Sequence, residues 1–239
     1  MQRSKSSLIL WFVTSLIFLF GQHFAPAQEV QEEKEDPASV QMRVLCSQTV
    51  EGAIDLKLMR GVDLLVDLNL LPAMVSDPLG VGRGELKLYR RQEGVDKSDP
   101  ILTITIPEIG KRFALVLLPD PANNPKVPYR HLLIRTDGLK FDASDLYMIN
   151  FTAVAIGGTL GDSKFVLEPG KSNVVTPKPG GDERMYQAQF YFQHEGKPRM
   201  FNDTRWPLAA TARVYLFFVP DPVRQSISYV SFREYGPFK

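Results

Sequence analysis

A two-residue alternation of apolar and polar side chains recurs along most of this chain, and it constrains the fold more than any other feature. Between Val62 and Leu70, for example, apolar residues recur at every second position, with Asp63, Asp67 and Asn69 between them. Successive side chains of a β-strand point to opposite faces, so this period indicates strands with one buried face. No long segment shows the 3.6-residue period of an amphipathic helix. The sequence therefore predicts an all-β fold.

The expected strands are short, and they are separated by Gly, Pro, Asn and Asp, the residues typical of turns. They cover residues 40–46, 54–58, 62–70, 85–90, 101–106, 112–118, 130–136, 146–151, 153–156, 164–167, 173–176, 184–193, 199–202, 213–219 and 226–234. Many short strands with turns between them are typical of a β-sandwich or a β-barrel.

Two blocks of sequence recur in the same order, which suggests an internal duplication. ELKLYRRQEG at 85–94 matches QAQFYFQHEG at 187–196 at an offset of 102, and RFALVLLPDP at 112–121 matches RVYLFFVPDP at 213–222 at an offset of 101. A period of about 100 residues indicates duplicated domains rather than a solenoid. Under this interpretation Leu115 corresponds to Leu216, and each points into its own core. The alternative is that the matches are coincidental.

Two halves of about 100 residues, each with about seven strands, have the dimensions of immunoglobulin-like sandwiches. We therefore expect two tandem immunoglobulin-like antiparallel β-sandwiches, at residues 39–140 and 141–239. One large sandwich or barrel of about 200 residues is the alternative. Because pockets form preferentially between domains, the arrangement of two tandem sandwiches would place a ligand groove between the halves.

The N-terminus has the pattern of a secretory signal peptide. Residues 1–7 carry Arg3 and Lys5 but no acid, an apolar run of 13 residues follows at 8–20, and Ala25-Pro26-Ala27 then supplies small residues for cleavage. The alternative is an uncleaved membrane anchor, but a spanning helix needs about 20 apolar residues. We therefore expect cleavage after residue 27 and no stable membrane span afterwards.

Residues 28–38, QEVQEEKEDPA, contain five acids, one lysine and no apolar cluster. A segment of this composition cannot bury enough surface to offset its ordering entropy, so we interpret it as a disordered acidic tether. The N-terminal pattern as a whole predicts export to the periplasm, the cell surface or the extracellular space.

Charge and residue counts argue against several classes of function. The chain has 28 Lys and Arg against 27 Asp and Glu, whereas nucleic-acid binders carry a basic excess. Cys46 is the only cysteine, so no intramolecular disulfide can form, and its phase within segment 40–46 predicts burial. His131 and His194 lie in different halves, so we expect no metal site and no cofactor. No catalytic constellation can be assembled, and we expect no enzyme.

Several ordered motifs resemble a group of secreted bacterial β-sandwich proteins of unknown function. They are NFTAVAIGGTLG at 150–161, LEPG at 167–170, RWPL at 205–208 and YLFFVPDP at 215–222, which a tyrosine-containing strand follows. The resemblance covers most of the body of the chain. It implies no activity.

Trp206 is the main candidate for a binding residue. It lies in a proline-bounded connection between two expected strands, where it either plugs the end of the sandwich or forms an exposed platform for a sugar or a partner protein. Tyr129 and Tyr229, which follow the two PDP segments at an offset of 100, are the further candidates.

These observations favour a non-catalytic binding or scaffolding protein of the cell envelope or extracellular space, with an envelope protein or a glycan as its partner. A carbohydrate-binding accessory module is the alternative, and a hydrolase comes third. A glycan module should show an exposed aromatic cluster around Trp206, whereas a scaffold should show a broad apolar patch or an open edge strand.

Overall fold

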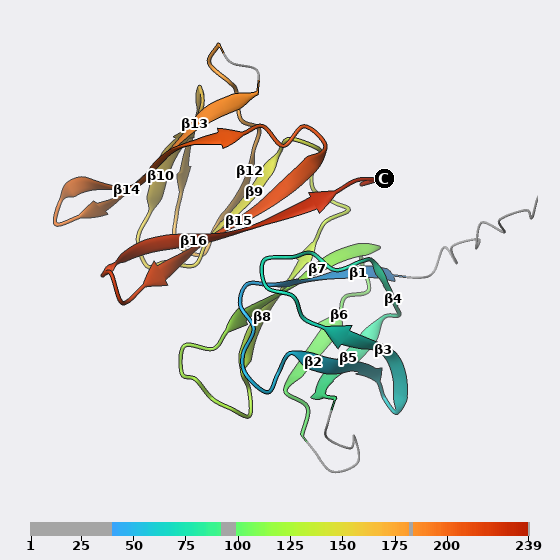
Figure 1. Cartoon of the computed structure of the whole chain (residues 1–239). Coiled ribbons are helices and arrows are strands. Elements are labelled where there is room, and N and C mark those ends of the chain that lie inside the picture. The colour runs from blue at the N-terminus through green and yellow to red at the C-terminus, as the bar shows by residue number, and fades with distance from the viewer. Residues whose placement is uncertain (1–39, 92–98, 182–183, 239) are drawn as a thin grey trace, which may run out of the picture. The chain divides into compact units, whose positions relative to one another are not determined.

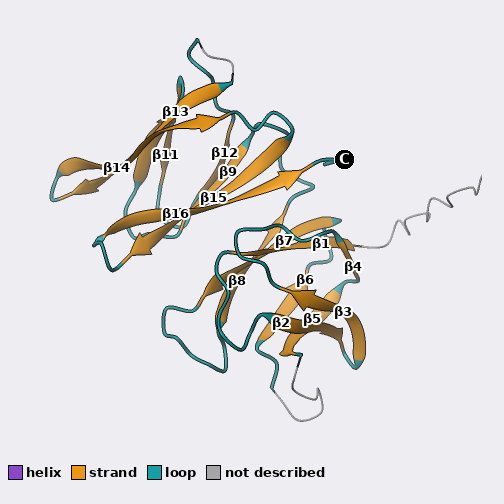
Figure 2. Ribbon diagram, viewed as in Figure 1, coloured by secondary structure: helices purple, strands orange, loops and turns teal. Residues whose placement is uncertain are grey.

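The computed structural model describes residues 40–91, 99–181 and 184–238. They belong to one compact unit, Pro37–Lys239. Sixteen strands and no helix lie within these described ranges, as Figures 1 and 2 show. The all-β fold predicted from the alternation is thus confirmed. The expected signal peptide at 1–27 and the expected tether at 28–38 lie outside the described residues.

The strands form four sheets of four strands each, with the orders β4-β1-β7-β8, β3-β2-β5-β6, β12-β9-β15-β16 and β11-β10-β13-β14. Their bounds are β1 Val40–Cys46, β2 Asp55–Arg60, β3 Asp63–Asn69, β4 Leu79–Val81, β5 Gly84–Arg90, β6 Leu102–Ile106, β7 Arg112–Pro119, β8 Tyr129–Arg135, β9 Leu146–Asn150, β10 Ile156–Leu160, β11 Ser163–Leu167, β12 Ser172–Val175, β13 Met185–His194, β14 Lys197–Pro207, β15 Ala212–Asp221 and β16 Ser226–Tyr235.

The second half repeats the connectivity of the first, with every strand number raised by eight. In both halves the first strand pairs in parallel with the seventh, β1 with β7 and β9 with β15, while the other strand pairs are antiparallel. Among the described residues, no strand of one half joins a sheet of the other, and no sheet closes on itself. Duplication of an ancestral segment would produce this pattern. The duplication itself stays a prediction.

Each half holds eight strands, where the sequence suggested about seven. In the first half the additional strand is β4, which lies in a glycine-rich segment between the strands expected at 62–70 and 85–90. It pairs with β1 through Val81 and Val40 at one end and Leu79 and Met42 at the other. Backbone pairing with β1 therefore extends the sheet where the side-chain pattern is too short to indicate a strand.

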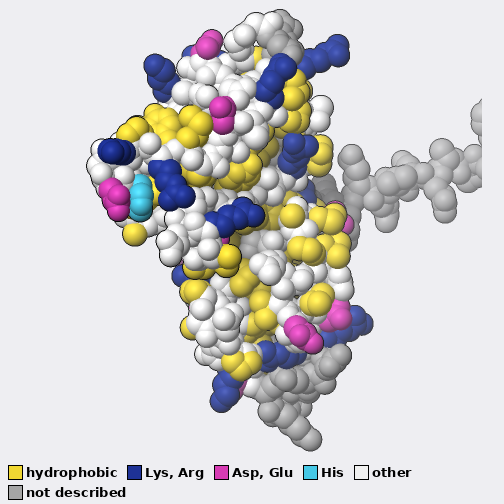
Figure 3. All heavy atoms as spheres, turned by 60° about the vertical axis from the view of Figure 1, so that its left-hand side comes forward, with side chains coloured by type: hydrophobic (Ala, Val, Ile, Leu, Met, Phe, Trp, Pro, Cys, Tyr) yellow, Lys and Arg dark blue, Asp and Glu magenta, His cyan; other side chains and the backbone are white. Residues whose placement is uncertain are grey.

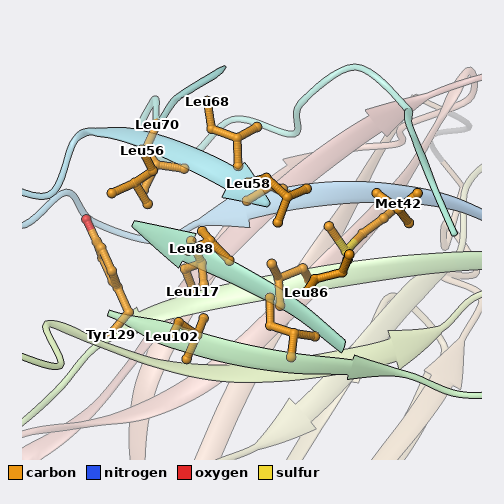
Figure 4. Packing of buried hydrophobic residues seen from close by; sticks show 14 of the residues in the cluster. Met42, Leu56, Leu58, Leu68, Leu70, Leu86, Leu88, Leu102, Leu117 and Tyr129 are labelled. Atoms are coloured by element: carbon orange, nitrogen blue, oxygen red, sulfur yellow. The ribbon is translucent and has the colours of Figure 1, made fainter. Parts of the chain in front are cut away.

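The core of the first sandwich is built from residues at alternate positions of its strands. Leu56 and Leu58 of β2 and Leu86 and Leu88 of β5 are fully buried against side chains of β1 and β7 in the facing sheet. Figure 4 shows these side chains pointing toward one another, with Tyr129 at the margin of the cluster. Truncating one such leucine to alanine typically costs about 2–5 kcal/mol, since a cavity remains.

The core of the second sandwich is richer in aromatic residues. Phe190 of β13 and Phe218 of β15 are fully buried, and their rings meet edge to face with centroids 5.2 Å apart. Leu216 belongs to this core, whereas Leu115 belongs to the first. The expected orientation of both leucines is therefore confirmed.

A third apolar cluster forms where residues of the two halves meet. Ala114 and Val116 of β7 enter it from one half, and Tyr215 and Phe217 of β15 enter it from the other. Alternate residues of β7 and β15 thus serve two different cores, one on each face of the sheet. Two covered faces explain why these two strands are apolar almost throughout rather than alternating.

A buried ion-pair network lies beside this third cluster. Nε and Nη2 of Arg213 donate to the two carboxylate oxygens of Glu234 at 2.8 and 3.1 Å. The Tyr215 hydroxyl donates to Glu234 at 2.7 Å, and Arg43 of the first half lies 3.1 Å from the same carboxylate. Buried charges need such partners, because an unpaired one would lose its hydration without compensation.

The segment 150–161 has specific packing requirements that account for its composition. The side-chain nitrogen of buried Asn150 donates to the carbonyls of Val154 and Leu167, and its oxygen accepts from Thr152. A Cβ on Gly158 would lie 2.4 Å from a backbone oxygen, and one on Gly161 would lie 1.9 Å from another. Only glycine allows such close approach of neighbouring backbones.

Candidate functional site

A hollow of about 200 Å³ lies on the side of the second sandwich between β14 and β16. Each of these strands is the last in its sheet, so the hollow opens where the two sheets end side by side. Trp206 of β14, Tyr186 of β13 and Tyr229 of β16 line it, together with Ser231 and Arg233. Figure 3 shows hydrophobic side chains at the surface of this half among Lys and Arg side chains.

Trp206 lies inside β14, not between strands as the sequence suggested. Its backbone pairs with Tyr186 of β13, and this long-range pairing extends β14 well beyond the short strand expected at 199–202. Proline and charged residues obscure the alternation there, because β14 is an edge strand whose side chains are largely exposed.

The indole of Trp206 is both packed and accessible. On one side its ring meets Phe190 of the core, with centroids 5.4 Å apart and an interplanar angle of 78°. Toward the hollow it meets Tyr229 at 5.4 Å and Tyr186 at 6.3 Å. Its Nε1 donates to the Thr204 hydroxyl at 2.8 Å, which fixes the ring orientation. Trp206 therefore covers the edge of the core and also forms one wall of the hollow.

The polar side chains that line the hollow include two phenols, the Ser231 hydroxyl and the Arg233 guanidinium. Burial raises the pKa of Tyr186 to about 12, although the nearby Arg233 guanidinium acts to lower it. Burial also raises the pKa of Tyr229, whose hydroxyl donates to Asn202 at 3.3 Å. Both phenols thus keep their protons at neutral pH. The single hydroxyl proton of Tyr229 is used by Asn202, so that oxygen can still accept a hydrogen bond, while the Arg233 guanidinium supplies donors beside the apolar floor.

Of the three residues singled out in the sequence, the structure brings together Trp206 and Tyr229 and leaves Tyr129 apart. Tyr129 is 1% exposed in the first core. Its hydroxyl accepts from the Val50 backbone nitrogen at 2.9 Å and donates to the Ala53 carbonyl at 3.0 Å. Burial raises the pKa of Tyr129 to about 12. We therefore assign Tyr129 a structural role, tying a loop to the core.

Sequence reasoning missed Tyr186, Ser231 and Arg233. The last two could have been found, because they follow Tyr229 at intervals of two residues on one strand and so share its face. Tyr186 had no such signal, since it alternates in phase with the core residues of β13.

Other sites have less to offer a ligand. A hollow of about 340 Å³ in the first half is lined mainly by aliphatic residues such as Leu68, Leu70 and Met74, and it contains no aromatic side chain. A space lined by residues of both halves, including Arg43 and Glu234, measures only about 20 Å³. That volume suits about one water molecule, so the groove expected between the halves is not present there.

The remaining candidate chemistry is sparse within the described ranges. No group of three or more His, Cys, Asp or Glu residues there is placed to hold a metal ion. Burial raises the pKa of the Cys46 thiol, whose Sγ donates to the Gln48 carbonyl at 3.3 Å. Burial lowers the pKa of His131. A thiol with a raised pKa is a poor nucleophile, so Cys46 behaves as a small core residue.

In the described part of the chain, no helix is long and apolar enough to cross a membrane. No family model matches the sequence, and a search of curated proteins finds no match.

Proposed function

We propose that this chain is an exported, non-catalytic binding protein of the cell envelope or extracellular space. In this proposal the hollow between β14 and β16 receives an apolar side chain of a partner protein. The observation that carries it is the aromatic lining, in which Trp206, Tyr186 and Tyr229 stand beside Arg233. Trp, Tyr and Arg are the residues that most often concentrate binding energy at protein interfaces.

The size and setting of the hollow support a protein partner. Its volume of about 200 Å³ is below the range of roughly 300–1,000 Å³ typical of small-molecule pockets. An apolar side chain is a better match for this space. The edge strands on both sides also offer backbone groups to an extended partner segment.

Export rests on the N-terminal pattern of charged, apolar and small residues. Material recovered from an exporting host should begin at Gln28 on N-terminal sequencing. Full-length protein in the membrane fraction would instead support an uncleaved anchor.

Site-directed photo-crosslinking tests the role of the hollow in the cells that normally produce this protein. A benzoylphenylalanine replacing Ser231, at the hollow, is compared with one replacing Val223, which is 92% exposed in the turn between β15 and β16. We expect one protein, identified by mass spectrometry, to cross-link from position 231 only. This product should weaken in a background carrying Arg233→Glu, which reverses the charge at the hollow without changing the core.

Two results would contradict the proposal. Position 231 could give no protein adduct, or it could give the same set of products as position 223. Either would show that no partner occupies the hollow.

A carbohydrate-binding accessory module is the second candidate function. The observation that favours it lies on a separate surface of the same half.

A further inference from the structure

The outward face of β13 carries an unusual row of side chains. The residues of β13 that point away from the core are one methionine, three glutamines and one tyrosine, while those between them are buried: the outward set is Met185, Gln187, Gln189, Tyr191 and Gln193. Alternate residues on a strand share one face and lie about 7 Å apart. A flat aromatic ring thus stands in line with neutral amide groups, and all of these residues are at least partly accessible.

The ring of Tyr191 lies over a glycine of the neighbouring strand. Tyr191 pairs with Gly157 of β10, and a Cβ on that glycine would lie 2.5 Å from Cε2 of the Tyr191 ring. The ring therefore extends over the glycine, in space that any other residue would occupy. The tyrosine is 37% exposed, so part of its surface faces solvent. Val166 and Met200, both exposed, continue this apolar row in register on the neighbouring strands.

The next row across the sheet is polar and linked by hydrogen bonds. The Thr159 hydroxyl donates to Oε1 of Gln189 at 3.4 Å, and Nε2 of Gln189 donates to Oδ1 of Asp203 at 3.1 Å. Gln187 donates to the same Asp203 oxygen. These contacts cross β10, β13 and β14 and restrict the orientations of the side chains that they join. Preorganised polar groups bind a ligand with less loss of entropy than free ones.

We propose that this outer face binds a carbohydrate chain, with Tyr191 as the stacking platform and the Gln187–Gln189–Asp203 group as the hydrogen-bonding row. A sugar ring has an apolar C–H face, which suits an aromatic ring, and a rim of hydroxyls, which both donate and accept. Amide and carboxylate side chains in a fixed row meet that second requirement.

The composition of the face argues against other macromolecules. A nucleic acid would need clustered positive charge, whereas the rows contain Asp203 and neutral amides beside Lys164 and Arg205. A protein partner would need a larger apolar patch at the centre of the contact than the single row of Val166, Tyr191 and Met200 provides, because a polar row lies directly beside it. A carbohydrate chain has both apolar C–H faces and hydroxyl groups, so it matches a face on which a row containing an aromatic ring lies beside a polar row.

Affinity electrophoresis of the full chain tests this proposal. The gels contain soluble xylan, β-glucan, α-glucan or glycol chitin, and purified peptidoglycan is tested by pull-down. Four variants are compared: Tyr191→Ala, Gly157→Ala, Tyr235→Ala and Trp206→Ala. Tyr235 is the matched control, because it is a tyrosine that is 61% exposed on β16, in the other sheet of the same half.

We expect at least one of these polysaccharides to bind the parent protein. Tyr191→Ala should weaken that binding about tenfold or more, a loss of about 1.4 kcal/mol or more. Gly157→Ala should weaken it too, because the new methyl group displaces the Tyr191 ring while the ring itself remains. Tyr235→Ala and Trp206→Ala should bind as the parent does. Circular dichroism and thermal melting confirm that each variant is folded.

Three results would overturn the proposal. If none of the polysaccharides binds, the face is an ordinary solvated sheet surface. If binding survives both Tyr191→Ala and Gly157→Ala, the sugar contacts another surface. If Trp206→Ala alone abolishes binding, the sugar site is the hollow between β14 and β16. The protein partner proposed for that hollow is tested separately by cross-linking, so the two proposals can fail independently.

Discussion

Glu234 is 4% exposed, and its carboxylate accepts hydrogen bonds from both Arg213 and Tyr215. Replacing it with alanine leaves the Arg213 guanidinium buried without its counter-ion, because that side chain is itself only 6% exposed. Breaking a buried pair by removing one partner typically costs about 3–5 kcal/mol. Arg213 keeps its bond to the Phe141 carbonyl and its position over the Phe141 ring. We therefore expect Glu234→Ala to lower the free energy of unfolding by about 3 kcal/mol, the lower end of that range.

The assay is urea unfolding followed by far-ultraviolet circular dichroism. With a slope of about 2 kcal/mol per molar urea, a loss of about 3 kcal/mol lowers the midpoint by about 1.5 M. Arg43→Ala removes the more exposed partner of the same carboxylate, with 24% of its side chain accessible, and should cost at most about 1 kcal/mol. The double variant Arg213→Met with Glu234→Leu should lose much less than Glu234→Ala, since it leaves no fully buried charge unpaired. Arg43 loses its carboxylate in both variants, but it is 24% accessible and keeps its bond to the Ser76 carbonyl.

A free energy of unfolding for Glu234→Ala within about 1 kcal/mol of that of the parent protein would refute this prediction. The prediction is also refuted if 1 M salt removes the difference, because salt screens exposed charges and has little effect on buried pairs.

Three further predictions concern buried polar groups. The folded-state pKa of Tyr129, about 12, lies above the ordinary value of 10.0. The stability that this difference contributes is therefore full below pH 10 and is lost between pH 10 and 12. In Tyr129→Phe, the free energy of unfolding measured in urea should change less with pH across that window. Cys46 should react slowly with a thiol reagent in the native protein and rapidly after denaturation, and equal rates would contradict its burial. Asn150→Asp should lower the thermal midpoint more than Asn150→Ala, because a carboxylate would face two carbonyl oxygens.

The alternation of apolar and polar residues by itself determined much of this fold. It located most of the strands and predicted the faces of Leu115, Leu216 and Cys46, because the two-residue period of a strand is a local property of the backbone. It failed for β14, where exposed edge positions accept almost any residue and only pairing with β13 defines the strand. The matched blocks likewise indicated two halves, but not that each contains a parallel pair between its first and seventh strands.

The candidate sites depend on tertiary structure to a greater degree. Tyr129 and Tyr229 follow similar PDP segments, yet one ties a loop to the core and the other lines a hollow. Trp206 and Tyr229 become neighbours because both sheets of the second half end at the same side. The two-residue period of the sequence shows which residues share a face of a strand. It does not state what covers that face, or which strand lies at an edge, because long-range pairing and packing decide both.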